Sequence, residues 1–203
     1  MKDKKIIYNL VKGICYPFFM LLYRPKIIGK EKLNTKEGYI LAGNHTAYLD
    51  VFLLIAANKR QIHFFTKIEL FNTKIKNSFF TSMGCIPVDR KKKNNGSILE
   101  GVKVLNEEKV VGIFPEGTYN RTDKIIMPFK YGAVAMAQKT SKAIIPFAIV
   151  GKYQIFGKSV KIIFGEPYKL KEDLEIENHK LEQKVISLIK ENQWKRKMVL
   201  AIN

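Results

Sequence analysis

The chain has 203 residues, enough for one domain with a hydrophobic core, and its apolar content of 46% excludes a disordered chain. It carries 36 basic and 18 acidic side chains, a net charge of +18, and such a field favours anionic partners: acidic lipid headgroups, nucleic acid or an acidic carrier protein. No nucleic-acid-binding module is present, and the aromatic residues are not interleaved with basic ones, so nucleic acid is not an expected partner.

The first predicted element is an apolar segment near the N-terminus. Its most apolar part, residues 14–23, contains Pro17, has no signal-peptide cleavage site after it, and is shorter than the roughly 20 residues that span a bilayer. Lysines precede the segment, and Arg24 and two further lysines follow it. We therefore expect residues 1–25 to form an amphipathic helical segment lying among lipid headgroups, with a core helix as the alternative.

From residue 26 onward, short apolar runs alternate with helical patterns, which indicates crossover connections between strands. The expected fold class is α/β: residues 26–203 form a single domain with a mostly parallel or mixed central sheet flanked by helices. Strands are expected at 38–42, 62–66, 85–88, 110–114, 144–149 and 160–164. Helices are expected at 51–58, 69–80, 97–108 and 131–139, followed by an amphipathic helix around 181–189.

The two cysteines, Cys15 and Cys85, lie in apolar surroundings without the spacing of a metal site. We expect two buried thiols and no bound metal.

The first candidate site is the sequence GNHTAYLD, residues 43–50, which lies between two apolar runs. His45 and Asp50 are two thirds of a hydrolase triad. On a regular helix, side chains five positions apart point about 140° away from each other. The two residues can therefore meet only if His45 lies in a turn before the helix. With Asp50 at the helix N-cap, its carboxylate could hold one imidazole nitrogen as N–H and leave the other as a base.

Two further loops follow predicted strands. The sequence GIFPEGTYNR, residues 112–121, places a Pro and Gly turn where backbone can approach a ligand, and GCIPVDR, residues 84–90, ends in an arginine. Arginine is scarce in this chain, with five against 31 lysines, yet Arg90 and Arg121 both fall in these loops. The planar guanidinium suits phosphate, although each arginine could equally form a surface ion pair.

Taken in order, these blocks resemble the motifs of the 1-acylglycerol-3-phosphate acyltransferase family. Asn44, His45 and Asp50 match its N-H-x4-D motif, residues 84–90 match its second motif, and residues 114–118 match F-P-E-G-T in full. The apolar strand with proline at Ile145-Pro146 matches the fourth motif. The segment TKIELF resembles the family's lysine-containing stretch and places Lys67 near the site. Tyr119 stands where the family commonly has arginine.

The resemblance implies that the missing nucleophile is the substrate's own hydroxyl. His45 would remove its proton while it attacks an acyl thioester, and Asp50 would stabilise the imidazolium. Lys67 or loop backbone N–H groups would stabilise the oxyanion. Glu116 would bind or orient the acceptor. The predicted substrate-binding set is completed by Asn44, Gly117 and Thr118, with Arg90, Arg121 and Lys130 on the phosphate.

The expected activity is acyl transfer to the sn-2 hydroxyl of 1-acylglycerol 3-phosphate, giving phosphatidic acid in phospholipid biosynthesis. The donor is expected to be acyl-CoA or acyl carrier protein, without a cofactor, and the location a peripheral one at the cytoplasmic face of the cell membrane. One alternative is the same chemistry on another lysophospholipid or an amino-acid-derived lipid. A different class of function is a non-catalytic basic protein bound to anionic lipids.

Overall fold

The computed structural model describes the backbone of residues 2–89 and 96–202 and the side chains of residues 7–89 and 96–193. It confirms a single α/β domain with a mixed sheet, whose strand order is β1-β7-β6-β2-β5-β3-β4. The strands are β1 (Lys26–Ile28), β2 (Tyr39–Gly43), β3 (Ile62–Lys67), β4 (Ile86–Val88), β5 (Val110–Ile113), β6 (Ala143–Val150) and β7 (Lys161–Phe164).

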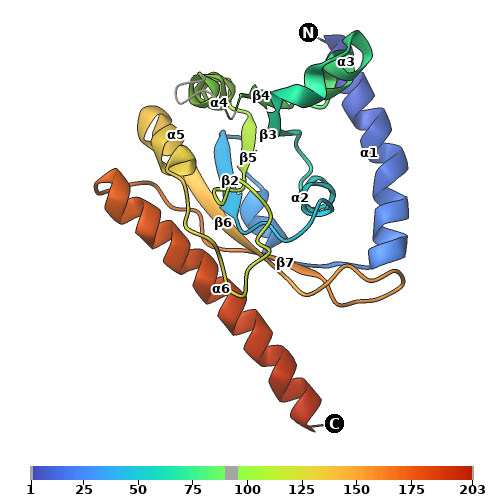
Figure 1. Cartoon of the computed structure of the whole chain (residues 1–203), viewed down its shortest axis with the longest axis vertical. Coiled ribbons are helices and arrows are strands. Elements are labelled where there is room, and N and C mark those ends of the chain that lie inside the picture. The colour runs from blue at the N-terminus through green and yellow to red at the C-terminus, as the bar shows by residue number, and fades with distance from the viewer. Residues whose placement is uncertain (1, 90–95, 203) are drawn as a thin grey trace.

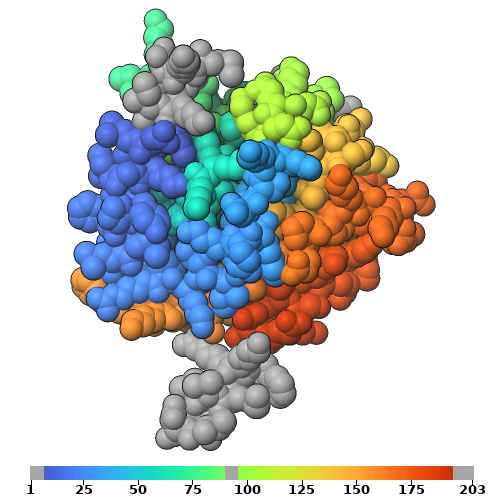
Figure 2. Space-filling model, turned by 180° about the vertical axis from the view of Figure 1, so that it is seen from behind, coloured from blue at the N-terminus to red at the C-terminus, as the bar shows by residue number. Residues whose placement is uncertain are grey.

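Helices cover both faces of this sheet (Figure 1). They are α1 (Lys2–Tyr23), α2 (Asp50–Ala57), α3 (Lys74–Ser82), α4 (Ser97–Asn106), α5 (Gly132–Thr140) and α6 (Leu174–Ile202), with short 3-10 helices η1 (Lys30–Leu33) and η2 (Ile68–Phe71). From the opposite side, α1 forms one flank of the molecule and the chain from α5 to α6 the other (Figure 2).

The core has two halves because successive side chains of a strand point to opposite faces of the sheet. In β2, Tyr39 and Leu41 belong to the cluster that includes residues of α1 and α2. Their neighbours Ile40 and Ala42 belong to the cluster under α4, α5 and α6. A strand buried on both faces is apolar throughout, which is why this run could be recognised in the sequence.

The sheet departs from the expectation at its edges. The short strand β1 was not anticipated, and it pairs in parallel with β7. β7 is antiparallel to β6, whereas β6, β2, β5, β3 and β4 run parallel to one another. The helix expected at 69–80 is two elements, because η2 ends at Phe71 and the Thr73 side chain caps the start of α3 by accepting from Lys76 N–H.

Helix α1 continues through Pro17 and is apolar on two sides. Tyr8 and Phe19 are buried in the molecule, which corresponds to the core-helix alternative, but Leu10, Phe18 and other apolar residues on the outer side are more than half exposed. Cys15 is exposed, so the expectation of two buried thiols is wrong for it, and Cys85 is half-buried. In the described part of the chain, no helix is long and apolar enough to cross a membrane.

Because β2, β3, β5 and β6 are parallel, their carboxyl ends lie on the same edge of the sheet. The segments that leave these strands begin at Asn44, Ile68, Phe114 and Gly151. Loops at the carboxyl ends of strands are where open α/β sheets place their sites. The sequence motifs therefore converge at this edge.

Candidate active site

Asn44 fixes the point at which the chain leaves β2. Its side-chain amide donates to the Ile149 carbonyl at 2.9 Å, and its oxygen accepts from Ile149 N–H at 2.8 Å. Asn44 is 4% exposed. The side chain thus continues the pairing of β2 with β6 for one more residue, while the backbone is free to turn toward His45.

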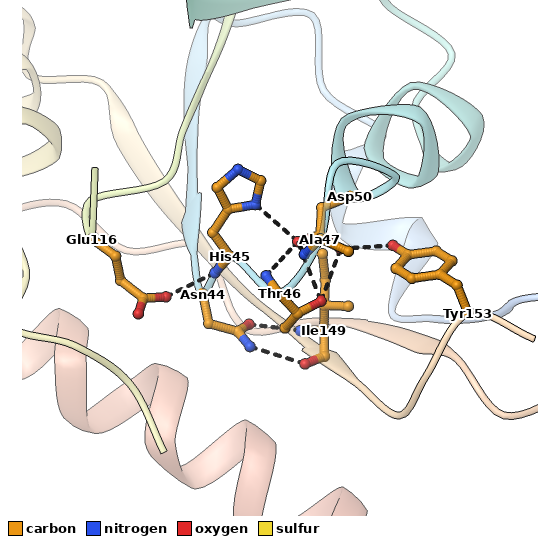
Figure 3. Close-up of polar contacts among 8 residues, drawn as sticks. All are labelled: Asn44, His45, Thr46, Ala47, Asp50, Glu116, Ile149 and Tyr153. Atoms are coloured by element: carbon orange, nitrogen blue, oxygen red, sulfur yellow. Dashed lines mark hydrogen bonds and ion pairs between the residues drawn. The ribbon is translucent and has the colours of Figure 1, made fainter. Parts of the chain in front are cut away.

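That turn brings His45 against Asp50, as the spacing predicted. His45 Nδ1 lies 2.9 Å from Asp50 Oδ2, and the aspartate is 0% exposed (Figure 3). The expected N-cap role of Asp50 is wrong: Leu49 is the N-cap, and Asp50 is the first helical residue. Its carboxylate points back to the turn and accepts from the N–H groups of Thr46 and Ala47.

This arrangement decides the tautomer of His45. An ionised carboxylate only accepts hydrogen bonds, so Nδ1 must donate its proton to Asp50. The other ring nitrogen, Nε2, then carries a lone pair. A neutral imidazole held in this way is equipped to accept a proton from a bound hydroxyl.

Aromatic rings support the imidazole. Phe114, the first residue after β5, stacks on His45 with ring centroids 3.8 Å apart and planes 13° apart. Phe64 of β3 and Phe147 of β6 contact Phe114 in turn. Tyr119 meets His45 edge-on at 4.4 Å. These contacts restrict the ring to the plane in which Nδ1 faces Asp50.

The F-P-E-G-T loop also holds the backbone of His45. Glu116 is 4% exposed; one oxygen accepts from His45 N–H and the other from Met127 N–H, both at 2.8 Å. The His45 carbonyl accepts from Asn120 N–H at 2.9 Å. Burial raises the pKa of Glu116, and the two backbone hydrogen bonds oppose that rise. Glu116 therefore has a positioning role, and the predicted contact with the acceptor stays a prediction.

Comparison with known proteins decides the family. The acyltransferase family model matches residues 24–150. The chain belongs to the acyltransferase family. A 1-acyl-sn-glycerol-3-phosphate acyltransferase of Bacillus subtilis is 37% identical over 70% of this chain and 72% of its own length. The enzyme of the same name from Borreliella burgdorferi is 31% identical over 72% of this chain and 60% of its own length.

A solved structure has the same fold. The crystal structure of the 1-acyl-sn-glycerophosphate (LPA) acyltransferase PlsC from Thermotoga maritima superposes with a TM-score of 0.76, at 19% identity over 95% of this chain and 82% of that one. This match shows the fold, while the family model and the Bacillus subtilis relative confirm the resemblance inferred from four motifs, and the chain is an acyltransferase enzyme.

The remaining residues predicted for this acyltransferase site are less closely gathered. Lys67 is exposed at the carboxyl end of β3, the same edge as His45, and Thr118 and Arg121 are exposed in the loop after β5. Gly117 has φ +75°, and a Cβ placed there would lie 2.9 Å from Lys130 Nζ, so the Lys130 side chain runs past this glycine. Arg90 lies outside the described residues. The contacts of these six residues with substrate stay predictions.

Tyr153 is part of the site and was missed. It lies in the segment after β6, and its hydroxyl donates to Asp50 Oδ1 at 2.7 Å (Figure 3). No motif includes it, but a polar residue three positions past the end of a parallel strand could have been flagged by the strand-end rule alone. Within the described residues, no three metal-binding side chains come together.

Proposed function

We propose that this acyltransferase transfers a fatty acyl group from an acyl thioester to the free sn-2 hydroxyl of 1-acylglycerol 3-phosphate, giving phosphatidic acid. The names of the similar bacterial enzymes support this acceptor. The observation that carries the proposal is the His45–Asp50 pair, in which Nδ1 faces the carboxylate at 2.9 Å and Nε2 remains a base.

In the proposed reaction, His45 Nε2 accepts the proton of the substrate hydroxyl as its oxygen attacks the thioester carbon. The carbon–oxygen bond forms, the carbon–sulfur bond breaks as the tetrahedral intermediate collapses, and the departing thiolate receives the proton from His45. Asp50 keeps the ring oriented and stabilises its charged form between these two transfers. No acyl-enzyme is required, so the enzyme needs no serine nucleophile.

We further propose that Lys67 or loop N–H groups stabilise the oxyanion, and that Arg90, Arg121 and Lys130 hold the acceptor phosphate. The positions of two of these residues support the proposal: Lys67 ends β3 at the same edge of the sheet as His45, and Lys130 runs along the F-P-E-G-T turn. A fixed positive charge is most effective where negative charge develops in a partly dry site.

Residues 1–25 are proposed to hold the enzyme on an anionic membrane surface. The outer side of α1 carries one stripe of exposed apolar residues, namely Ile7, Leu10, Ile14, Phe18 and Leu21. At the N-terminal end of this stripe, Ile7 lines a shallow hollow together with Ile75 and Phe79 of α3, and both of these are also exposed. An apolar surface that continues over two helices, in a protein with net charge +18, suits acidic headgroups above acyl chains.

The direct test is a matrix of donors and acceptors with purified protein on anionic vesicles. Acyl-CoA and acyl carrier protein thioesters are each paired with 1-acylglycerol 3-phosphate, its dephosphorylated analogue and other lysophospholipids. The phosphate-bearing acceptor is expected to be preferred. His45→Ala should lower turnover by about 10²- to 10⁴-fold without unfolding the protein, since it removes the base. A folded His45→Ala variant of normal activity would falsify the mechanism, and preference for an unphosphorylated acceptor would overturn the substrate.

A further inference from the structure

We propose that Tyr153 is a positioning residue for the Asp50–His45 pair, and that the buried aromatic side of α1 holds Tyr153 in place. The helix proposed to anchor the enzyme would then also set the geometry of its active site. This inference rests on the proposed function, because it gives His45 the role of base.

The first argument is the set of contacts made by Asp50. Its Oδ2 faces His45 and accepts from two backbone N–H groups, and its Oδ1 accepts from the Thr46 hydroxyl at 3.0 Å and from the Tyr153 hydroxyl at 2.7 Å. All of these groups except Tyr153 come from residues 45–50 themselves. Tyr153 is therefore the contact that fixes the carboxylate relative to the rest of the domain.

The direction of that hydrogen bond is settled by chemistry. A carboxylate has no proton to give, so the phenol donates. Burial and the neighbouring Asp50 charge raise the pKa of Tyr153 well above its ordinary value. The hydroxyl thus stays protonated over the whole range in which an enzyme works. A donor on Oδ1 limits rotation of the carboxylate and keeps Oδ2 facing the imidazole.

The second argument is what holds Tyr153. Its ring meets Tyr23 edge-on at 5.7 Å and Phe19 at 6.4 Å, and these two α1 residues contact each other at 5.1 Å. The same stretch of chain is joined to α1 by its backbone, since Phe156 N–H donates to the Leu22 carbonyl. Phe19 is 8% exposed, whereas its neighbour Phe18 is 64% exposed. One side of α1 thus contacts Tyr153, which supports the His45–Asp50 pair, and the other side faces outward.

These contacts separate two roles of α1 that would otherwise be confused. If the helix only anchored the enzyme, changes on either side would matter on a membrane and neither would matter for a dissolved substrate. If its inner side positions Tyr153, changes there should lower turnover even in detergent micelles. Adjacent residues on opposite sides of one helix provide the comparison.

The first experiment measures kcat and KM of the full-length chain in detergent micelles. Tyr153→Phe should lower kcat by about tenfold, the lower end for a hydrogen bond to a charged group, with KM for both substrates and the melting temperature unchanged. Tyr168→Phe is the matched control, because Tyr168 is a half-buried tyrosine whose hydroxyl is buried and has no hydrogen-bond partner among the described residues. It should behave as wild type.

A double-mutant cycle tests whether Tyr153 acts through Asp50. In an Asp50→Ala background, where the acceptor is gone, Tyr153→Phe should cause no further loss. An additive loss there, a loss confined to KM, or wild-type kcat in Tyr153→Phe would each overturn the positioning role. His45→Ala is measured alongside: if it is inactive while Tyr153→Phe is fully active, only this inference fails. If His45→Ala is active, the proposed function fails and the role of Tyr153 fails with it.

The second experiment compares Phe19→Leu with Phe18→Leu. Phe19→Leu should lower kcat in micelles, whereas Phe18→Leu should lower the fraction bound to anionic vesicles. Tyr23→Leu repeats the inner-side change if Phe19→Leu does not fold. An inner-side variant with wild-type kcat would show that α1 does not position Tyr153 and would overturn that half of the proposal.

Discussion

At the scale of single residues, Glu116 has contacts that its predicted role did not include. It was expected to bind or orient the acceptor, which stays a prediction; in the structure, both of its oxygens accept backbone N–H groups, one from His45 and one from Met127. A carboxylate can serve two donors at once, whereas an amide offers only one acceptor oxygen. The identity of the residue as Glu therefore matters for holding three segments together.

Glu116→Gln is expected to destabilise the protein by about 1–3 kcal/mol, because one buried N–H then faces an amide NH₂ and loses its partner. Turnover should fall as well, since the His45 backbone loses its support. Chemical denaturation and kcat measure the two effects. Glu182→Gln is a comparison, because Glu182 is another carboxylate that accepts a single backbone N–H, from Phe129, and it lies outside the site. It should leave kcat unchanged.

The same variant should change how stability depends on pH. The folded-state pKa of Glu116 is raised above its ordinary value of 4.5 by burial. Its contribution to stability is therefore fully present below that value and is lost as pH rises through the raised folded pKa. The difference in unfolding free energy between wild type and Glu116→Gln should narrow over this range. A difference that is constant or widens with rising pH would contradict the raised pKa.

Phosphate recognition is a third prediction at this scale. Arg121→Ala and Lys130→Gln should each lower kcat/KM by about ten- to a hundredfold with 1-acylglycerol 3-phosphate, the loss expected when a charged hydrogen bond is removed. Lys139→Gln is the matched control, because Lys139 is exposed in the last turn of α5. The losses should nearly vanish with the dephosphorylated acceptor. Equal losses on both acceptors would assign these residues to the donor or to the loops.

The residues recognised from sequence are those whose geometry is local. His45 and Asp50 meet across one turn, so their spacing was enough to predict their contact. Tyr153 reaches the same site from the segment after β6, 103 positions away from Asp50, and which residue of that segment faces the His45–Asp50 pair depends on the register of the sheet. Register is set by packing over many residues, and no short motif records it.

At the scale of elements, the strands in the middle of the sheet and most helices were predicted within one or two residues. Their apolar runs are long enough to leave a clear pattern. β1 was not predicted, because a lysine followed by two isoleucines is too short an apolar run to form a clear pattern. Residues 69–80 were predicted as one helix but fall into two, η2 and α3, because the Thr73 side chain caps a new helix start.

Helix α1 carries the prediction at this scale. Replacing Leu10 and Phe18 by serine should release the enzyme from anionic vesicles, because each exposed apolar side chain contributes about 1.5–3 kcal/mol when buried in lipid. Co-sedimentation measures the bound fraction. Ile176→Ser is the control, since Ile176 is half exposed on α6. Full binding of the double variant would place the anchor elsewhere. Point variants are preferred to deletion, because Tyr8 and Phe19 belong to the interior.

At the scale of the whole molecule, function depends on the parallel part of the sheet. The parallel strands bring the two motif loops and Tyr153 to one edge, while β7 and β1 run in the opposite direction and close the sheet beside α1. The core cluster on the side of α1 and α2 contains Phe64 and Phe147, with Phe114 and Tyr153 packed against it, and these side chains support His45 and Asp50. None of these four residues belongs to the cluster described under α4, α5 and α6. The two layers of helices therefore differ in role: one supports the sheet, and the other joins the active site to the proposed membrane surface.

The pairing of Asn44 with Ile149 has a consequence for how the enzyme folds. These residues are 105 positions apart in sequence, and the contacts of His45 with Glu116 and of Asp50 with Tyr153 span 71 and 103 positions. Contacts between such distant segments form only after large loops have closed, which makes them late events in folding. On dilution from denaturant, helical circular dichroism should return first and enzymatic turnover in the slowest phase. Simultaneous recovery of both signals would mean that the helices and the active site form in the same step, and would contradict late assembly of the site.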